Sequence, residues 1–137
     1  MTTRQPKVHT QLGRVAGRIF AANDLTNQLL IEHLDPAAWR AKPPGNARTI
    51  AAIFTHMHNV RCKWVRLTAP HLKVPPQLNR TRCTRQQARA GLAQSASRCS
   101  EMLAEALSEI RSRLAIINST ALGGSARDKR AERPRRQ

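Results

Sequence analysis

Apolar residues recur at intervals of three and four along three separate stretches of this chain, and this spacing most constrains its fold. The stretches cover about residues 10–34, 49–68 and 84–114. One face of an α-helix has this spacing, whereas a strand alternates at every second residue. The first stretch ends at Asp35-Pro36, because proline pushes the residue before it out of the α region. The sequence therefore predicts an all-α fold, an up-down helical bundle with three main helices.

Each predicted helix carries an apolar face that we expect to be buried. On the first helix it comprises Leu12, Val15, Ala16, Ile19, Ala22, Thr26, Leu29, Leu30 and His33. On the second helix it comprises Ile50, Ile53, Phe54, Met57, Val60 and Trp64, and we expect both Trp39 and Trp64 to anchor the core. On the third it comprises Ala88, Leu92, Ser95, Cys99, Met102, Leu103, Ala106, Ile110 and Leu114. Apolar faces this broad indicate that the three helices pack against a fourth element as well as against one another.

Proline-containing connectors separate the three helices, and a capping signal precedes the third. The first connector holds a Pro-Pro-Gly run and the second holds Pro75-Pro76, both typical of loops. Thr84 and Gln87 have the spacing of a capping box, a hydroxyl followed three residues later by an amide. We expect one helical domain over residues 1–117. Residues 118–137 are rich in arginine and broken by glycine, which predicts a disordered basic tail.

The charge of the chain is strongly basic. It has 24 Lys and Arg against 8 Asp and Glu, a net charge of +16. Between Pro36 and Ser100 there are twelve basic residues and no acid. Such a surplus attracts polyanions, so one hypothesis is a small basic helical module that binds nucleic acid or another polyanion. Recognition-helix motifs and aromatic stacking platforms are missing, which predicts binding without sequence specificity.

The cellular setting follows from the apolar runs and the cysteines. No run of 18 apolar residues is present, so the sequence predicts no membrane span. The first residues are polar and basic, unlike a secretory signal. Cys62, Cys83 and Cys99 form an odd set without paired spacing, which fits free thiols in a reducing compartment. We therefore expect a cytoplasmic protein.

The second predicted helix carries the most conspicuous candidate site residues, His56 and His58. Residues two apart on a helix point about 200° away from each other, so these two imidazoles cannot hold one ion together. One can face the interior while the other faces solvent, and we favour boundary positions at the edge of the core for both. His58 and Cys62 have the spacing of half a zinc site. The sequence offers no other half with recognisable spacing.

Arg61 falls on the apolar side of the same helix. A buried guanidinium requires an anion or a carbonyl as partner. We expect Arg61 either to reach out of the helix end or to pair with an acid such as Asp24 or Glu32. Binding of a substrate carboxylate or phosphate is the alternative.

The order of features over residues 29–67 resembles the DinB/YfiT-like superfamily. A helix is followed by a connector with Trp39 and Pro-Pro-Gly, then by a helix with Ile53-Phe54-Thr55-His56 and a later Trp64. The likeness covers about residues 8–108. It implies a four-helix bundle, often dimeric, in which three histidines hold a divalent metal such as zinc, nickel, manganese or iron. It also implies that His56 is one metal ligand, with His58 as a possible second.

Characterised members of that family are metal-dependent hydrolases and thiol transferases that act on small molecules. The family carries its other two ligands as His-x-x-x-His on the last helix, and this chain has no histidine after His71. One hypothesis is a truncation or frameshift near residues 108–118 that leaves the fourth helix largely missing; the alternative is a natural short form without metal. We therefore expect an incomplete metal site and no tightly bound metal in the monomer. The sequence does not decide whether the chain is an enzyme. We also expect a homodimer through exposed apolar helix faces, and the substrate is not indicated.

Overall fold

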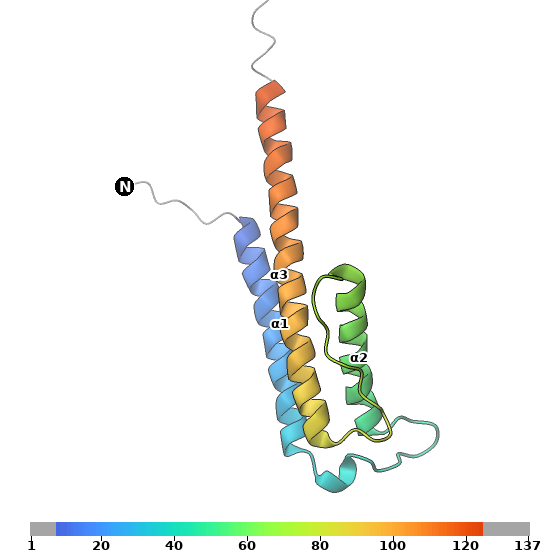
Figure 1. Cartoon of the computed structure of the whole chain (residues 1–137). Coiled ribbons are helices and arrows are strands. Elements are labelled where there is room, and N and C mark those ends of the chain that lie inside the picture. The colour runs from blue at the N-terminus through green and yellow to red at the C-terminus, as the bar shows by residue number, and fades with distance from the viewer. Residues whose placement is uncertain (1–7, 125–137) are drawn as a thin grey trace, which may run out of the picture. The chain divides into compact units, whose positions relative to one another are not determined.

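The computed structural model describes residues 8–124, with side chains from residue 11 to residue 120. It contains three α-helices, α1 (Val8–His33), α2 (Ile50–Thr68) and α3 (Arg85–Gly124), and a short 3-10 helix, η1 (Pro36–Ala38) (Figure 1). The described residues include no strand, so the prediction of an all-α fold is confirmed. None of the described helices combines the length and apolarity needed to cross a membrane.

The third helix extends beyond the predicted end near residue 114. It continues to Gly124, so residues 118–124, assigned to the tail by the sequence, are helical. Polar residues in these turns satisfy their hydroxyls within the helix, since Ser119 and Thr120 both donate to the carbonyl of Ile116. The described part of the helix ends at Gly123-Gly124, where helical backbone is less favourable. The rest of the predicted tail, residues 125–137, lies outside the described residues.

Side-chain caps fix where two of the helices begin. The Thr49 hydroxyl accepts a hydrogen bond from the amide of Ala52 at the start of α2. Before α3, the Thr84 amide donates to Gln87 Oε1 (3.0 Å), and the Gln87 amide donates to Thr84 Oγ1 (3.1 Å). This reciprocal pair is the predicted capping box, which satisfies two amides that the first turn would otherwise leave free.

The chain divides into two compact units, one ending at Ala104 and one beginning at Glu105. The first unit holds α1, η1, α2 and the first turns of α3. The second unit holds the remaining turns of α3, where the guanidinium of Arg113 pairs with Glu109 at 2.6 Å. Each unit is described separately below.

In the first unit, α1 runs antiparallel to both α2 and the first turns of α3, which gives the predicted up-down arrangement (Figure 1). The helices α2 and α3 run in the same direction, because the connector of residues 69–84 returns along α2 before α3 begins, with turns at residues 70–72 and 80–82 on either side of residues 73–79. Sixteen residues can span at most about 50 Å, more than the roughly 30 Å of α2, which leaves length for the turns at both ends. The connector is therefore long enough to reverse the chain without a helix.

The return segment is attached to α2 by hydrogen bonds. The Asn59 side chain donates to the carbonyl of Leu78 (3.1 Å) and accepts from its amide (3.0 Å). Nearer the α3 end, Asn79 Oδ1 accepts from the amides of Thr81 and Arg82 and closes a turn. These contacts satisfy backbone groups that a strand or helix would otherwise pair internally.

The core lies where the two connectors meet the helices. Trp39 stacks on Phe54 with ring centroids 6.2 Å apart, and its Nε1–H donates to the carbonyl of Cys83 at 3.0 Å. The Trp39 carbonyl accepts from the amide of Ala51 at 3.0 Å. One residue therefore joins the start of α2 to the segment just before α3. The buried cluster consists of Ile31, Trp39, Ala51, Phe54, Cys83, Ala88 and Leu92.

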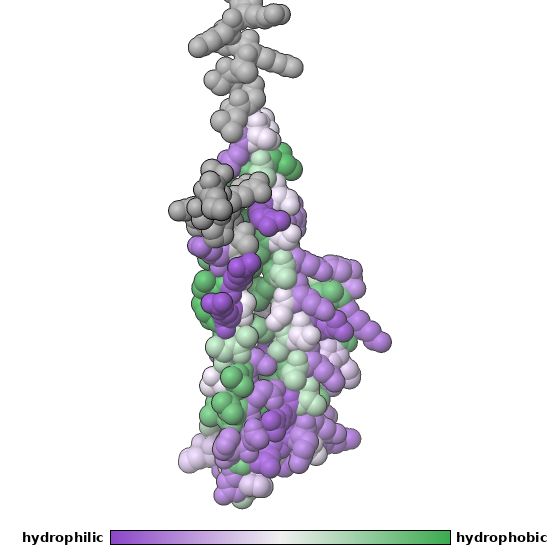
Figure 2. Space-filling model, turned by 90° about the vertical axis from the view of Figure 1, so that its left-hand side faces the viewer, coloured by the Kyte–Doolittle hydropathy of each residue, from purple (hydrophilic) through white to green (hydrophobic). Residues whose placement is uncertain are grey.

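The predicted buried faces of α1 and α2 are only partly correct. On α1, Leu12, Val15, Ile19, Leu29 and Leu30 are exposed, as is Trp64 on α2. Figure 2 shows hydrophobic residues, drawn in green, on the surface of the α1 side. The packed sides of both helices are rotated by about one residue, or 100°. They carry small and polar residues whose polar groups are hydrogen-bonded within the fold, including Asn27, Thr55 and His58.

Two helix glycines form a matched pair for testing the packing of α3 on α2. A Cβ at Gly91 would lie 2.8 Å from Leu78 Cδ1 and 3.3 Å from His58 Nδ1, whereas at Gly17 it would meet no described atom within 4 Å. We expect Gly17→Ala to stabilise the fold by about 0.5–1 kcal/mol through helix propensity. We expect Gly91→Ala to destabilise it by roughly 1–2 kcal/mol, because the hydrogen-bonded His58 ring cannot move aside. Urea unfolding measures both, and equal stabilisation would contradict this packing.

Candidate functional site

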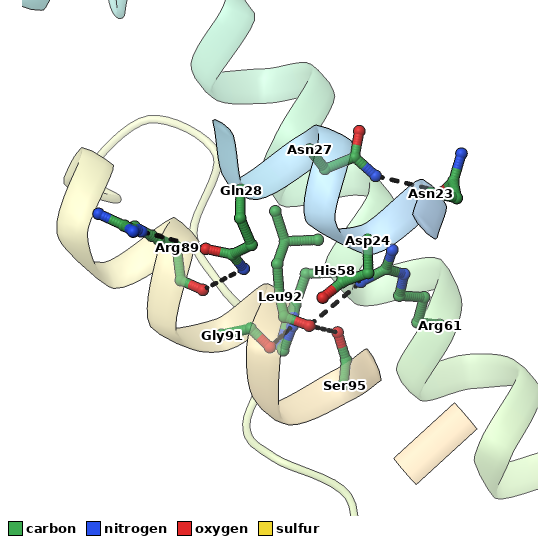
Figure 3. A network of polar contacts seen from close by, with 10 residues as sticks. All are labelled: Asn23, Asp24, Asn27, Gln28, His58, Arg61, Arg89, Gly91, Leu92 and Ser95. Atoms are coloured by element: carbon green, nitrogen blue, oxygen red, sulfur yellow. Dashed lines mark hydrogen bonds and ion pairs between the residues drawn. The ribbon is translucent and has the colours of Figure 1, made fainter. Parts of the chain in front are cut away.

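A polar network lies between the three helices of the first unit (Figure 3). The guanidinium of Arg61 on α2 pairs with Asp24 Oδ1 on α1 at 2.8 Å and donates to the carbonyl of Leu92 on α3 at 3.1 Å. It also lies over the Phe20 ring, 5.3 Å from the centroid. Both charged side chains are largely removed from solvent, with 11% and 17% of their surface exposed. One cation thus contacts all three helices.

This pairing confirms one of the two partners expected for Arg61. The other expected acid, Glu32, instead pairs with Arg89 at 3.1 Å on a half-exposed surface. Since Asp24, Leu92 and Phe20 already surround the guanidinium, Arg61 serves the packing of the helices in this structure. Substrate binding by Arg61 would require this network to open.

His58 lies at the centre of the contact between α2, α3 and the return segment. Its side chain is fully buried, with Nδ1 2.8 Å from the carbonyl of Gly91 and Nε2 2.9 Å from that of Pro76. A neutral imidazole has a single ring proton to donate, so it can donate to one of these oxygens at a time. Cys62 Sγ lies 3.6 Å from Nε2. Backbone therefore encloses both nitrogens, and an ion would have to displace it to reach them.

His56, two residues earlier, points to the opposite side and is exposed. It lines a groove of about 460 Å³ between the start of α2 and the end of the return segment. Arg48 and Arg80 contribute guanidinium groups from the two connectors, and the other lining residues are Thr49, Ala52, Thr55, Asn59 and Thr81. No acid lines this groove. The structure thus turns the two histidines to opposite sides, as their spacing predicted, but it buries His58 completely instead of leaving both at the edge of the core.

The metal implied by the family resemblance does not fit the residues that the structure describes. Among them, no group of three His, Cys, Asp or Glu side chains is arranged to hold an ion. Cys62 is near His58, but the partners of His58 are backbone carbonyls rather than further ligands. His56 has two cationic arginines as groove neighbours, which disfavour a divalent cation. His56 as a metal ligand stays a prediction that depends on donors from elsewhere.

The three cysteines are all buried and unpaired. Burial raises the pKa of the Cys62, Cys83 and Cys99 thiols above the ordinary value of 9.0. For Cys62, the nearby Arg66 and Arg61 oppose this effect without cancelling it. The thiolate is the reactive form of cysteine, so the folded protein offers no activated thiol nucleophile among these residues.

The groove itself was not foreseen from the sequence. Arg48 and Arg80 lie 32 positions apart in two different connectors, and no spacing rule brings them together. The signal that was available is the acid-free stretch between Pro36 and Ser100. It indicated that basic side chains there could not be neutralised locally, although it did not indicate where they would meet.

Comparison with known proteins leaves the chain without an assigned family. No protein-family model matches it, and no curated protein or solved structure is significantly similar to it. The resemblance to the DinB family therefore has no support from a family match. The structure does show an all-helical fold in which α1 and α2 each pack against α3.

Removing one charge of the network should be costly. In Asp24→Asn, Arg61 would stay buried without its anion, and we expect a loss of roughly 2–3 kcal/mol in the free energy of unfolding. Replacing both partners, as in Asp24→Leu with Arg61→Met, should recover most of it. The exposed pair Glu109–Arg113 provides the control, since Glu109→Gln should cost less than about 0.5 kcal/mol. Chemical denaturation measures all of them; a double variant less stable than Asp24→Asn would contradict this model.

Proposed function

We propose that this protein binds nucleic acid through the phosphate backbone, without sequence specificity, using the basic surface around its two connectors. One observation carries the proposal. Of the twelve basic residues between Pro36 and Ser100, Arg61, Arg89 and Arg98 form ion pairs with described acids. The other nine, which have no ion pair in the described part of the chain, are Arg40, Lys42, Arg48, Lys63, Arg66, Lys73, Arg80, Arg82 and Arg85.

Several of these cations are held close together. Arg40 of the first connector donates to the carbonyls of Thr81 and Cys83 in the second connector, so the two segments lie side by side. Arg80 and Arg82 flank Thr81, and Arg48 lines the same groove as Arg80. Cations fixed on one surface can contact successive phosphates of a single polymer.

The groove lined by Arg48, Arg80 and His56 supports the proposal because it suits a phosphate group. Guanidinium groups match phosphate oxygens geometrically and bind them in pairs of hydrogen bonds. The Thr49 hydroxyl, which accepts from Ala52, keeps its own proton as a neutral donor nearby, and the Asn59 amide has a second proton besides the one donated to Leu78. The groove has no carboxylate to repel an anion. Phosphate contacts of this kind fix position on a nucleic acid but do not read its sequence.

Titration of a fluorescent single-stranded oligonucleotide at rising salt tests the proposal. Arg48→Gln/Arg80→Gln should lower the affinity about tenfold or more at low salt and reduce the slope of log K against log salt by about 1–2. The control Arg14→Gln/Arg18→Gln removes the same charge from exposed positions of α1, away from the groove. It should have a smaller effect on both quantities.

Two results would contradict the proposal. Binding that does not respond to salt would exclude a phosphate-backbone interaction, and equal losses in the two double variants would exclude the groove. Heparin and inorganic polyphosphate serve as competitors. If either displaces the oligonucleotide at far lower charge concentration than nucleic acid does, the partner is another polyanion.

The metal-dependent role implied by the resemblance is kept as a second hypothesis with its own test. With His56 as its sole described ligand, we expect the monomer to hold no divalent metal tightly, since one imidazole binds weakly without further donors. Metal analysis of protein purified without chelator, with His56→Ala alongside, measures this. One tightly held metal per chain that is lost in His56→Ala would contradict our expectation and restore the metalloprotein hypothesis.

A further inference from the structure

Two rows of large apolar side chains remain exposed on α1 and α2. The row on α1 comprises Leu12, Val15, Ile19, Leu29 and Leu30, and the row on α2 comprises Ile53, Trp64 and Leu67. Ile19 has 67% of its surface exposed and Trp64 has 59%. Single exposed apolar residues are common, but rows of them on adjacent helices indicate an interaction surface.

Most of the row on α1 faces away from the first turns of α3. Gln28 and Glu32 of α1 contact Arg89 of α3. At about 100° per residue, Ile19 lies roughly 140–180° around the helix axis from these two positions. Ile19, Leu12 and Leu30 are therefore on the side that the first turns of α3 do not cover, whereas Leu29 lies only about 60° from Glu32.

The row on α2 lies on the same side of the helix pair. His58 faces α3, where it contacts Gly91, and Arg61 faces α1, where it contacts Asp24. Trp64 lies about 60° beyond Arg61 and about 120° from His58. On α1, Leu12 and Leu30 lie about 80° and Ile19 about 100° from Phe20, which contacts Arg61. These three residues and the α2 row therefore lie nearest the contact between α1 and α2, on the side away from the first turns of α3. We call the two rows together the α1–α2 face.

The α1–α2 face has helix-pairing periodicity and no charge. Its positions alternate in steps of three and four, the heptad spacing by which helices pack along a seam. With the positions between them included, the series on α1 is Leu12, Val15, Ile19, Ala22, Thr26 and Leu29, and on α2 it is Ile50, Ile53, Met57, Val60, Trp64 and Leu67. Leu30 adjoins the α1 series, and Ile50 and Met57 also pack against the buried cluster. The chain has 24 basic residues in 137, and none of them occupies these twelve positions. Depletion of charge marks the centre of protein interfaces.

We propose that the α1–α2 face is a dimer interface at which two copies of this chain pack face to face about a two-fold axis. The exposed apolar side chains offer on the order of 600 Å² per copy, close to the roughly 800 Å² per partner of a standard interface. The lack of basic residues on the α1–α2 face also favours a second copy as the partner. Two strongly basic chains repel each other and can meet only where no cations face one another. Exposed Trp64 supplies the large aromatic anchor that such interfaces favour.

The dimer has a salt dependence opposite to that of nucleic-acid binding. Two molecules of +16 repel each other, and added salt screens this repulsion. Dimerisation should therefore strengthen with salt while phosphate-backbone binding weakens. The two proposals rest on different surfaces, so failure of one leaves the other intact.

Sedimentation velocity over a range of protein and salt concentrations tests the interface. Wild type should shift from monomer to dimer with rising concentration, and Ile19→Glu should stay monomeric over the same range. Leu25→Glu is the matched control, because Leu25 is on the same helix with 59% exposure but lies outside the α1–α2 face. It should dimerise like wild type. Ile19 is exposed in the monomer, so its variant should keep the wild-type circular dichroism.

Tryptophan emission gives a second measurement on the same samples. Trp39 is buried and should report no change, whereas Trp64 should move to shorter wavelength as the dimer forms. Wild type that stays monomeric at every concentration and salt would overturn the proposal. So would a dimer that persists in Ile19→Glu, or one whose Trp64 emission does not change on dilution. A dimer lost only in Ile110→Glu would assign the interface to the last turns of α3 and would overturn the proposal equally.

Discussion

The cation of Arg61 is the interaction on which the packing of the three helices depends. It joins a carboxylate of α1, a carbonyl of α3 and the aromatic face of Phe20 from a single position on α2. A charge in this position is stable only while all of these partners are in place. The contact is therefore directional in a way that apolar packing is not, and it fixes the helices at one rotation about their axes.

That rotation explains why the fold buries small and polar residues while larger apolar ones stay outside. Once Asp24 and Arg61 face each other, Asn27 of α1 and Thr55 and His58 of α2 turn inward with them. Each of these side chains makes a hydrogen bond within the fold, and no buried side-chain nitrogen or oxygen among the described residues is without a partner in reach. The exposed apolar rows of α1 and α2 are rotated outward by about 100° and become available to a partner.

The sequence was sufficient for the features that depend on local chemistry. Helix periodicity, the Thr84–Gln87 capping box and the opposite orientations of His56 and His58 follow from spacing alone. Asp24 was one of two acids expected to neutralise Arg61. Periodicity could not predict which face of α1 and α2 would be buried, because two neighbouring faces of each helix carry residues able to pack. The sequence also gives no sign that polar side chains such as Asn27, Thr55 and His58 will be buried.

The features that depend on long-range contacts were not predictable in the same way. Nothing in the second connector indicates that it runs back along α2, since its contacts are made by single residues such as Asn59. The groove of Arg48 and Arg80 depends on that path, because only the returning chain brings Arg80 beside the start of α2. The length of α3 was underestimated because its polar residues satisfy their hydroxyls within the helix.

The parallel course of α2 and α3 has an electrostatic consequence for the connector end of the first unit. Both helices begin there, so the positive ends of two helix dipoles point toward the same region, each equivalent to about half an elementary charge. The end of α1 contributes a single opposing dipole of similar size. The aligned peptide groups of the two helices therefore leave a residual positive potential at this end, although side-chain and backbone acceptors cap several of their first amides. An anion approaching the connectors would meet a field set by the chain reversal as well as by arginine.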